Sequence, residues 1–265
     1  MVVKNADIII VGGGVQGLFL AYYAKKMFPT KEIILFESNI VGSGITAYSG
    51  HLHHPYGNGE KKELTKISIT LYKELIDEYK SLPIEERDFV GVCKIENIER
   101  CIHDLIVENP LINAFEYTYK KLDNDFITIS GMKSLISRRN LSDFLLEIIS
   151  KQGVIVYEGT TVVKNCKQDG LFNIKTQAGQ KFKSLVLLNA SGASTYDLIR
   201  HQKKEIKTKK VVAFHINKLP GKDESVTYFF DDDAFIMPQP YYSRYLFSYR
   251  CDEWSVKINS NSLKI

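Results

Sequence analysis

A glycine-rich turn near the amino terminus constrains the fold more than any other feature of this sequence. The apolar run from Ala6 to Val11 leads directly into Gly12-Gly13-Gly14-Val15-Gln16-Gly17, which has the spacing G-x-G-x-x-G. Such a motif is informative only where it follows a buried strand and opens a helix. Here the apolar run 6–11 is the preceding strand, and the helical spacing of apolar residues from Val15 to Phe28 indicates the following helix. A second apolar run from Ile33 to Phe36 indicates the next strand. The segment up to Phe36 is therefore predicted to form a βαβ unit of a parallel sheet.

The glycines of this motif have separate physical tasks. Gly12 permits a tight turn, Gly14 lets a pyrophosphate approach the backbone, and Gly17 allows the helix and the strand to pack closely. The helix N-terminus also favours an anion, because its first N–H groups have no partner within the helix. Glu37 stands twenty residues after Gly17, where a carboxylate accepts hydrogen bonds from a ribose. The pattern predicts a dinucleotide site; the alternative is a glycine-rich turn that binds nothing.

The rest of the pattern divides into two regions. Helices are expected over 64–80, 96–107, 141–151 and 194–200. Strands at 154–157, 161–166, 171–176 and 180–182, joined by Asp-Gly and Ala-Gly turns, are expected to form an antiparallel meander. The apolar run 185–189 is expected to return to the parallel sheet, and strands at 211–217, 225–230, 235–237 and 245–249 belong to the second region. The predicted fold class is α/β, a Rossmann-like parallel sheet with an antiparallel meander plus a smaller α+β domain. The predicted domains are 1–80 with 140–205, which bind the nucleotide, and 81–139 with 206–265.

Composition excludes several classes of protein. With 44% hydrophobic and 25% charged residues in 265, the chain has enough apolar material for a core and is not disordered. The net charge of +4 is spread along the chain and does not indicate nucleic acid as the main partner. Polar residues and glycines interrupt the apolar stretch 6–24, which argues against a membrane span or a signal peptide. The four cysteines form no C-x-x-C pair, so we expect a reducing, cytoplasmic location.

The loop after Glu37 distinguishes between two dinucleotides. It contains Gly42-Ser43-Gly44-Ile45-Thr46-Ala47-Tyr48-Ser49-Gly50, a run of small residues and hydroxyls that can pass close to a second phosphate and a flavin ring. This composition favours FAD over NAD. The alternative interpretation is a solvated surface loop.

These motifs make the chain resemble the D-amino-acid oxidase family of FAD-dependent oxidoreductases, which includes glycine, sarcosine and L-2-hydroxyglutarate oxidases. Four segments carry the resemblance: 7–17 with Glu37, 42–50, the helix near Asn140 with the following meander, and Asn189-Ala190-Ser191-Gly192-Ala193-Ser194. The resemblance implies FAD as the cofactor, bound noncovalently, because Tyr48 falls where some relatives attach the flavin through a histidine. Together, the motif and the resemblance predict a set of cofactor-binding residues: Gly12, Gly14, Val15, Gln16, Gly17, Glu37, Ser38, Gly44, Thr46, Ser49, Gly50, Val162, Ala190 and Gly192.

The resemblance also implies a reaction. It predicts oxidation of a small amino acid or amine at a C–N bond by hydride transfer to the flavin, with oxygen or another acceptor reoxidising it. The stretch Ser49-Gly50-His51 keeps a 2-hydroxy-acid oxidase as an alternative. Family members usually continue for roughly another hundred residues, which is about the size of a small domain. A further alternative is therefore a truncated or split flavin-binding subunit without turnover of its own, with a partner subunit supplying the remainder.

Three residues are candidates for substrate chemistry. His51 follows the flavin-side loop, and Arg250 ends a strand in the second region, where a guanidinium can bind a substrate carboxylate in bidentate fashion. Tyr242 belongs to the aromatic cluster nearby. The alternatives are a plain surface loop for His51 and a surface cation for Arg250. No metal is expected, because the histidines at 51, 53 and 54 lack the further ligands of a metal site, and Arg138 is interpreted as a surface residue.

Overall fold

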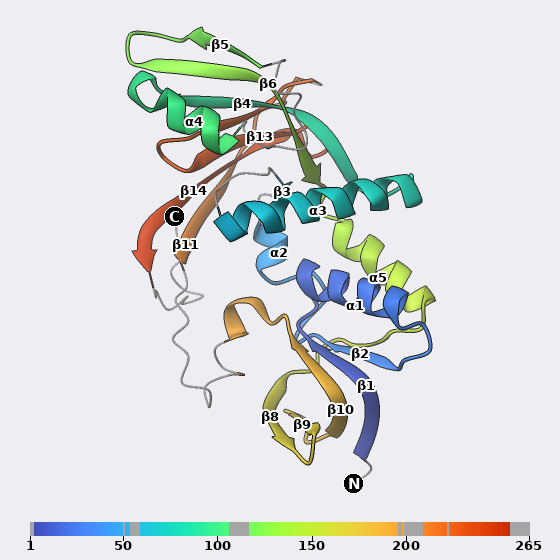
Figure 1. The fold of residues 1–265 in the computed structure, drawn as a ribbon. Helices are drawn as coiled ribbons and strands as arrows, with labels where there is room; N and C mark the ends of the chain where they lie inside the picture. The colour runs from blue at the N-terminus through green and yellow to red at the C-terminus, as the bar shows by residue number, and fades with distance from the viewer. Residues whose placement is uncertain are drawn as a thin grey trace. The chain divides into compact units, whose positions relative to one another are not determined.

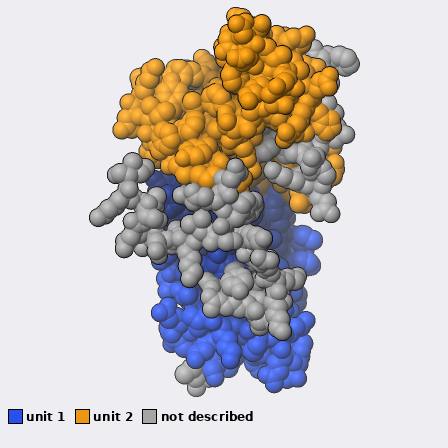
Figure 2. Space-filling view, turned by 90° about the vertical axis from the view of Figure 1, so that its left-hand side faces the viewer, with its two compact units in different colours: residues 1–49, 139–206 blue, residues 50–138, 207–265 orange. Residues whose placement is uncertain are grey.

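The computed structural model describes residues 3–49, 51–53, 59–105, 117–195, 198, 209–221 and 223–254. The chain forms two compact units, each assembled from two separate stretches of sequence (Figure 2). Unit 1 comprises residues 1–49 and 139–206, and unit 2 comprises residues 50–138 and 207–265. Residues 50–80, which the sequence assigned to the nucleotide-binding domain, therefore cluster with unit 2.

Unit 1 is built on a six-stranded sheet that confirms the predicted α/β fold class. Its strand order is β7-β2-β1-β10-β9-β8. The strands are β1 (Val3–Val11), β2 (Ile33–Phe36), β7 (Ile155–Tyr157), β8 (Val162–Gln168), β9 (Leu171–Thr176) and β10 (Lys181–Asn189). Strand β1 is parallel to both β2 and β10, whereas β9 is antiparallel to β10 and to β8. The glycine turn thus follows the carboxyl end of a central parallel strand.

Helices and strands of unit 1 bury the apolar runs that define them. Helices α1 (Val15–Met27) and α5 (Leu141–Lys151) lie side by side (Figure 1). Every residue of β2 is buried, as expected for a parallel strand covered on both faces. A cluster of buried hydrophobic residues lies on β1, β2 and the meander and contains Ile9, Val11, Ile34, Phe36, Val162, Ile174 and Phe182. Helix α5 has the predicted bounds, and Gly153 follows it with a left-handed φ of 83°.

Two details of this sheet differ from the sequence-based expectation. The run 154–157 was expected in the meander, but β7 pairs in parallel with β2 at the sheet edge, because helix α5 provides the crossover that a parallel strand requires. Strand β10 is continuous, whereas two strands were expected, since its parallel pairing with β1 already begins at Lys181 opposite Val3. The Asp169-Gly170 hairpin is confirmed, with both φ angles positive at 52° and 78°.

Unit 2 is built on an eight-stranded sheet with the order β11-β14-β13-β12-β4-β6-β3, in which β5 also pairs with β6. The strands are β3 (Leu52–His53), β4 (Ile84–Lys94), β5 (Thr118–Lys121), β6 (Phe126–Ser137), β11 (Lys209–Ile216), β12 (Val226–Phe229), β13 (Ala234–Gln239) and β14 (Arg244–Trp254). Helices α3 (Gly59–Glu78) and α4 (Ile98–Leu105) belong to this unit. The two long strands β4 and β6 were not predicted, because four consecutive charged residues follow Ile84 at the start of β4 and Gly131 interrupts β6.

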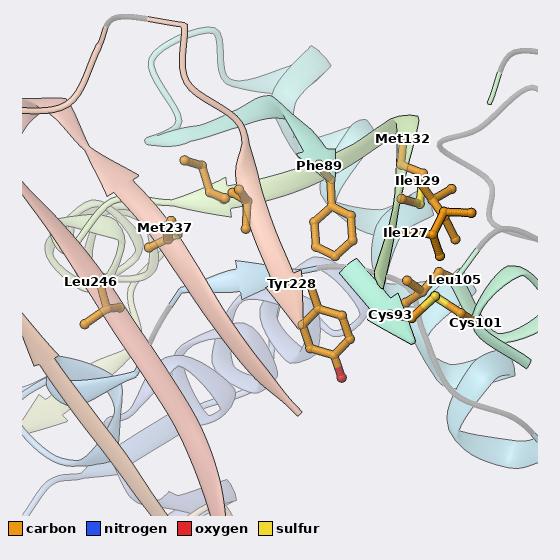
Figure 3. Packing of buried hydrophobic residues seen from close by; sticks show 12 residues of the cluster. Phe89, Cys93, Cys101, Leu105, Ile127, Ile129, Met132, Tyr228, Met237 and Leu246 are labelled. Atoms are coloured by element: carbon orange, nitrogen blue, oxygen red, sulfur yellow. The ribbon is translucent and has the colours of Figure 1, made fainter. Parts of the chain in front are cut away.

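The core of unit 2 is mainly aliphatic and also contains two aromatic rings and several sulfur atoms (Figure 3). The rings of Phe89 and Tyr228 stack with centroids 5.9 Å apart. Cys93 and Cys101 lie next to each other and are fully buried, and burial raises the pKa of both thiols. These two cysteines therefore act as packing residues, and all four cysteines of the chain are free. Among the helices that the structure describes, none combines the length and the hydrophobicity needed to cross a membrane.

Candidate cofactor and active site

The glycine turn of unit 1 leaves no room for side chains. Gly12 has a φ of 107°, and a Cβ added to it would lie 2.3 Å from the carbonyl oxygen of Ala190. A Cβ on Gly17 would lie 1.8 Å from the carbonyl oxygen of Gly12. The Ala190 N–H in turn donates to the Val11 carbonyl over 2.8 Å. The turn, the first turn of α1 and the returning segment at Ala190 are therefore in backbone contact, which only glycine allows at these two positions.

The N-terminus of α1 is arranged to receive an anion. Gly14 is its N-cap and, in the part of the chain that the structure describes, makes no side-chain cap hydrogen bond, and the first turn contains no acidic residue. The Val15 N–H donates to the Thr46 Oγ1 atom over 3.1 Å, so the hydroxyl proton of Thr46 is free to donate elsewhere. Because the first turn itself contains no acidic residue, the positive end of the helix dipole favours a phosphate group.

Glu37 lies beside this turn at the end of β2. Its Oε2 atom accepts the Gly13 N–H over 2.7 Å, and its Oε1 atom accepts the Asn39 N–H over 2.8 Å and the Ser38 hydroxyl over 3.0 Å. These donors fix the orientation of the carboxylate. Among the described residues, Oε2 accepts only the Gly13 hydrogen bond and keeps a lone pair, so the group can also accept a hydrogen bond from a ribose hydroxyl.

The loop that follows Glu37 returns to the glycine turn. The Gly42 N–H donates to the Gly13 carbonyl over 2.9 Å, and the short helix α2 (Ile45–Tyr48) carries Thr46 to the start of α1. The Ser49 hydroxyl donates to the Thr46 carbonyl over 3.2 Å. Gly192 has a φ of 57° and faces the Ile45 side chain, which a Cβ would meet at 3.8 Å.

The structure thus gathers most predicted cofactor residues at one edge of the unit 1 sheet. Gln16 is exposed in the first turn of α1, and Gly44 has open space around it. Val162 is buried in the core cluster with Ile9 and Phe36. Gly50 lies outside the described residues. The predicted residues fall into three contacting groups, namely Gly12 with Gly17 and Ala190, Gly14 with Val15, Thr46 and Ser49, and Glu37 with Ser38, whereas Gly192 lies near Ile45.

The predicted substrate residues occupy separate places in unit 2. The Arg250 Nη1 atom lies 2.9 Å from Asp233 Oδ2, and the Tyr228 hydroxyl donates to Asp233 Oδ1 over 2.9 Å. Tyr242 lies in the turn before β14, with the Arg244 guanidinium 5.0 Å from its ring centroid. Arg250 follows Arg244 by six residues along β14, which corresponds to roughly 20 Å. The structure therefore does not bring Tyr242 and Arg250 together.

His51 belongs to a hydrogen-bonded group that the sequence did not reveal. Its backbone has a φ of 54°, and its carbonyl accepts the Ser137 N–H over 2.9 Å. The Ser137 Oγ atom lies 3.4 Å from His51 Nδ1 and 2.9 Å from His53 Nε2. The His53 ring packs against Tyr72 at a centroid distance of 4.6 Å. Burial, with a further contribution from His51, lowers the pKa of His53 to about 4, so His53 is neutral at pH 7.

Arg138 was interpreted as a surface residue, and the structure buries part of its side chain. Its guanidinium carbon lies 3.8 Å from the Tyr241 ring centroid, and its Nη2 atom lies 3.2 Å from Glu85 Oε2. Its Nε atom is buried and has no hydrogen-bond partner among the described residues. Arg138 is thus an ordered, half-buried cation rather than a plain surface residue. Nothing in the local sequence could indicate this, because the contacts come from Glu85 and Tyr241, which are distant in the sequence. Over the described residues, no three His, Cys, Asp or Glu side chains are placed to hold a metal ion.

Comparisons with known proteins agree on one family and one fold. The family model described as FAD dependent oxidoreductase (DAO) matches residues 7–250. A glycine oxidase from Geobacillus kaustophilus superposes with a TM-score of 0.76 at 16% identity, covering 97% of this chain and 75% of that one. The open form of NikD, an unusual amino acid oxidase essential for nikkomycin biosynthesis, gives 0.73 at 16%, covering 94% and 70%.

An L-proline dehydrogenase from P. horikoshii gives a TM-score of 0.75 at 16% identity, covering 93% of this chain and 70% of that one. No curated protein matches significantly. Identities this low establish a shared fold and leave the substrate open.

Proposed function

Because the chain belongs to the DAO family of FAD-dependent oxidoreductases, we propose that it oxidises a small amino acid or amine at its C–N bond by hydride transfer to FAD. The observation that carries this proposal is the backbone cradle of unit 1, in which Gly12, Gly17 and Ala190 touch and Glu37 is held by Gly13. The structural neighbours include proteins named as a glycine oxidase, an L-amino acid deaminase and an L-proline dehydrogenase, which favours an amino acid as the substrate.

The residues of the cradle fit FAD group by group. The N-terminus of α1 would hold the pyrophosphate, Glu37 would bind the ribose of the adenosine, and the Thr46 hydroxyl would donate to the flavin-side phosphate, with Ser49 packed behind it through its hydrogen bond to the Thr46 carbonyl. When bound, FAD supplies the two-electron acceptor of the reaction. We propose noncovalent binding, since Tyr48 replaces the histidine through which some relatives attach the flavin, and its side chain is 76% exposed.

Two side chains of unit 2 are proposed to act on the substrate. We assign proton handling to His51, whose imidazole is held by Ser137. We assign the carboxylate anchor to Arg250, whose guanidinium binds the Asp233 carboxylate and has five donors in all. Tyr242 stays a prediction of the sequence. The acceptor that reoxidises the flavin is proposed to be oxygen or a second redox partner, in the cytoplasm.

An anaerobic substrate screen tests this function. FAD-loaded protein is mixed with amino acids, amines and 2-hydroxy acids, and the bleaching of the flavin spectrum is followed. We expect bleaching by an amino acid or amine, and hydrolysis of the resulting imine should release a carbonyl compound together with ammonia or an amine. Bleaching only by a 2-hydroxy acid would replace the C–N reaction with the C–O alternative. That reaction is compatible with the role proposed for His51, because an imidazole can also accept the proton of a substrate hydroxyl.

The split-subunit alternative has its own outcome. The chain covers 70% to 75% of the glycine oxidase and NikD chains. A protein that binds FAD but is bleached by no substrate until a partner polypeptide is added would favour this alternative and contradict independent turnover. Peroxide detection in air then distinguishes oxygen from another acceptor.

A further inference from the structure

We propose that Glu158, in the turn between β7 and β8, is a positioning residue for the cofactor, because its carboxylate holds the loop that follows Glu37 against the glycine turn. This inference deepens the FAD-binding part of the proposed function and does not depend on the substrate. All the residues that carry it belong to unit 1. No sequence motif indicates Glu158, since its partner Val41 lies 117 residues earlier in the chain.

The Glu158 carboxylate makes a short hydrogen bond to the backbone of this loop. Its Oε1 atom accepts the Val41 N–H over 2.6 Å, which is a short distance for an N–H donor and is typical of a charged acceptor. Glu158 itself is exposed, whereas Val41 is buried. A buried backbone N–H needs an acceptor, and Glu158 is the acceptor that the described residues provide for it.

Backbone hydrogen bonds fix Glu158 beside the loop. Strands β7 and β2 pair in parallel, so their carboxyl ends lie side by side. Beyond these ends, the Gly159 N–H donates to the Asn39 carbonyl and the Thr160 N–H donates to the Glu37 carbonyl, each over 2.8 Å. The turn that contains Glu158 therefore runs alongside the loop, and its carboxylate adds a side-chain contact to this backbone framework.

Val41 connects the contact with Glu158 to the glycine turn. A Cβ added to Gly13 would lie 3.0 Å from the Val41 Cγ2 atom, so the Val41 side chain packs on the backbone of the turn. The next residue, Gly42, donates its N–H to the Gly13 carbonyl over 2.9 Å. Gly13 is also the residue whose N–H binds the Glu37 carboxylate. A displaced loop would therefore disturb the residue that orients Glu37.

The same loop leads to the phosphate end of the cradle. A Cβ on Gly42 would lie 2.6 Å from the Cβ and Oγ atoms of Ser142 on α5, so the loop is packed against α5 at this point. It then continues into α2, where the Thr46 Oγ1 atom accepts the Val15 N–H over 3.1 Å. Glu158 thus fixes a segment that lies between the residues proposed for the ribose and those proposed for the phosphates.

Loss of the Glu158 acceptor should weaken FAD binding by lowering the population of the assembled site. With the acceptor gone, the packed loop leaves the buried Val41 N–H without a partner, so conformations in which this group reaches water become more favourable. The apparent Kd rises in proportion as the competent fraction falls. We expect a rise of roughly five- to thirtyfold, below the full value of a hydrogen bond to a charged group because the contact is partly exposed.

Three variants of Glu158 separate the hydrogen bond from the charge in a fluorescence titration of FAD into the apoprotein. Glu158→Leu removes both, Glu158→Gln keeps an acceptor oxygen without charge, and Glu158→Asp keeps the charge but withdraws it by one methylene. We expect the Kd to rise in the Leu and Asp variants and to stay close to the parent value in the Gln variant. The Asp variant also gives an answer if the Leu variant does not fold. A high Kd for Gln with a parent-like Kd for Asp would assign the effect to charge and overturn the proposal.

Asp7→Leu is the matched control for a general loss of stability. The Asp7 Oδ2 atom accepts the Glu32 N–H over 2.9 Å, so this variant removes the same kind of hydrogen bond at the opposite end of β2. It should lower the unfolding free energy and leave the Kd for FAD unchanged. Equal rises of the Kd in Asp7→Leu and Glu158→Leu would contradict a positioning role for Glu158.

Amide hydrogen exchange of the protein without FAD separates this inference from the proposed function. The Val41 and Gly42 amides should exchange faster in Glu158→Leu than in the parent or Glu158→Gln, and the Glu32 amide should exchange faster only in Asp7→Leu. Unchanged exchange at Val41 in Glu158→Leu would overturn the role of Glu158, whatever the protein binds. A parent protein that shows the expected exchange but binds no FAD would instead contradict the proposed function.

Discussion

The two units build their candidate sites from different materials. In unit 1, the site is made of backbone: N–H groups of α1 and Gly13, and close approaches that Gly12 and Gly17 permit. In unit 2, it is made of side chains, with His51, His53 and Ser137 brought together by the pairing of β3 with β6. A site made of backbone groups is encoded in consecutive residues, so a short sequence motif is enough to predict it. A side-chain site depends on the register of distant strands.

The largest expected effect comes from filling the backbone cradle. In Gly17→Ala, the new Cβ would lie 1.8 Å from the Gly12 carbonyl oxygen, so strand, turn and helix must separate. We expect a loss of roughly 3–5 kcal/mol in unfolding free energy together with loss of FAD binding, measured by denaturant unfolding and flavin retention. Gly179→Ala, in the turn between β9 and β10 of the same unit, adds a Cβ with nothing within 4 Å and carries only the strain of its φ of 82°, so it is the control. Equal FAD retention in both variants would contradict the backbone account.

The next effect is smaller and concerns a side chain of unit 1. Glu37→Gln keeps the shape of the residue but removes the charge that accepts the Gly13 and Asn39 N–H groups. Hydrogen bonds to a charged group contribute about 1.5–3 kcal/mol, so we expect the Kd for FAD to rise roughly ten- to a hundredfold in a fluorescence titration. Glu32→Gln, an exposed carboxylate of the same unit, should leave the Kd unchanged. A Glu37→Gln protein that binds FAD normally would show that the carboxylate has no part in the site.

In unit 2, the next expected effect is a dependence of the unfolding free energy on pH, caused by His53. The pKa of His53 is about 4 in the folded protein against 6.5 for an ordinary histidine. Between these values the unfolded chain binds a proton that the folded chain does not, so stability falls as pH falls from 6.5 to 4. At about 1.4 kcal/mol per unit, we expect a loss of roughly 1–3 kcal/mol. His53→Gln should flatten this part of the stability curve, and an identical slope in the variant would exclude His53 as its source.

The smallest effect tests whether the unit 1 meander carries stability unrelated to the cofactor. Lys164, Lys175 and Lys181 are exposed and directly opposite one another on β8, β9 and β10. Like charges in such positions repel, so Lys175→Glu should stabilise the protein by a few tenths to about 1 kcal/mol at low salt and less at high salt. Lys183→Glu, opposite Asn173, makes the same change of charge without a flanking lysine pair. Equal gains in both variants would assign the effect to net charge alone.

Much of unit 1 was predictable from local signals. The β1-α1-β2 segment, the position of Glu37 and the bounds of α5 followed from apolar periodicity, glycine spacing and helix termini. Strand β4 of unit 2 was not predictable in this way, because its first half is almost entirely charged, with Glu86 and Asp88 on the exposed face. Its pairing with β6 depends on residues far away in the sequence. The contact of Ser137 with His53 spans 84 residues of sequence, and no local pattern encodes it. Sequence reasoning could therefore single out His51, but not its contact with Ser137.

The most direct test of the account is the absorption spectrum of the purified protein with and without added FAD, followed by acid precipitation. We predict oxidised-flavin bands in the native protein, saturable uptake of added FAD by any apoprotein, and release of all flavin into the supernatant. A protein that stays colourless with excess FAD would contradict the central claim that the unit 1 cradle binds FAD. Flavin that remains in the pellet would contradict noncovalent attachment.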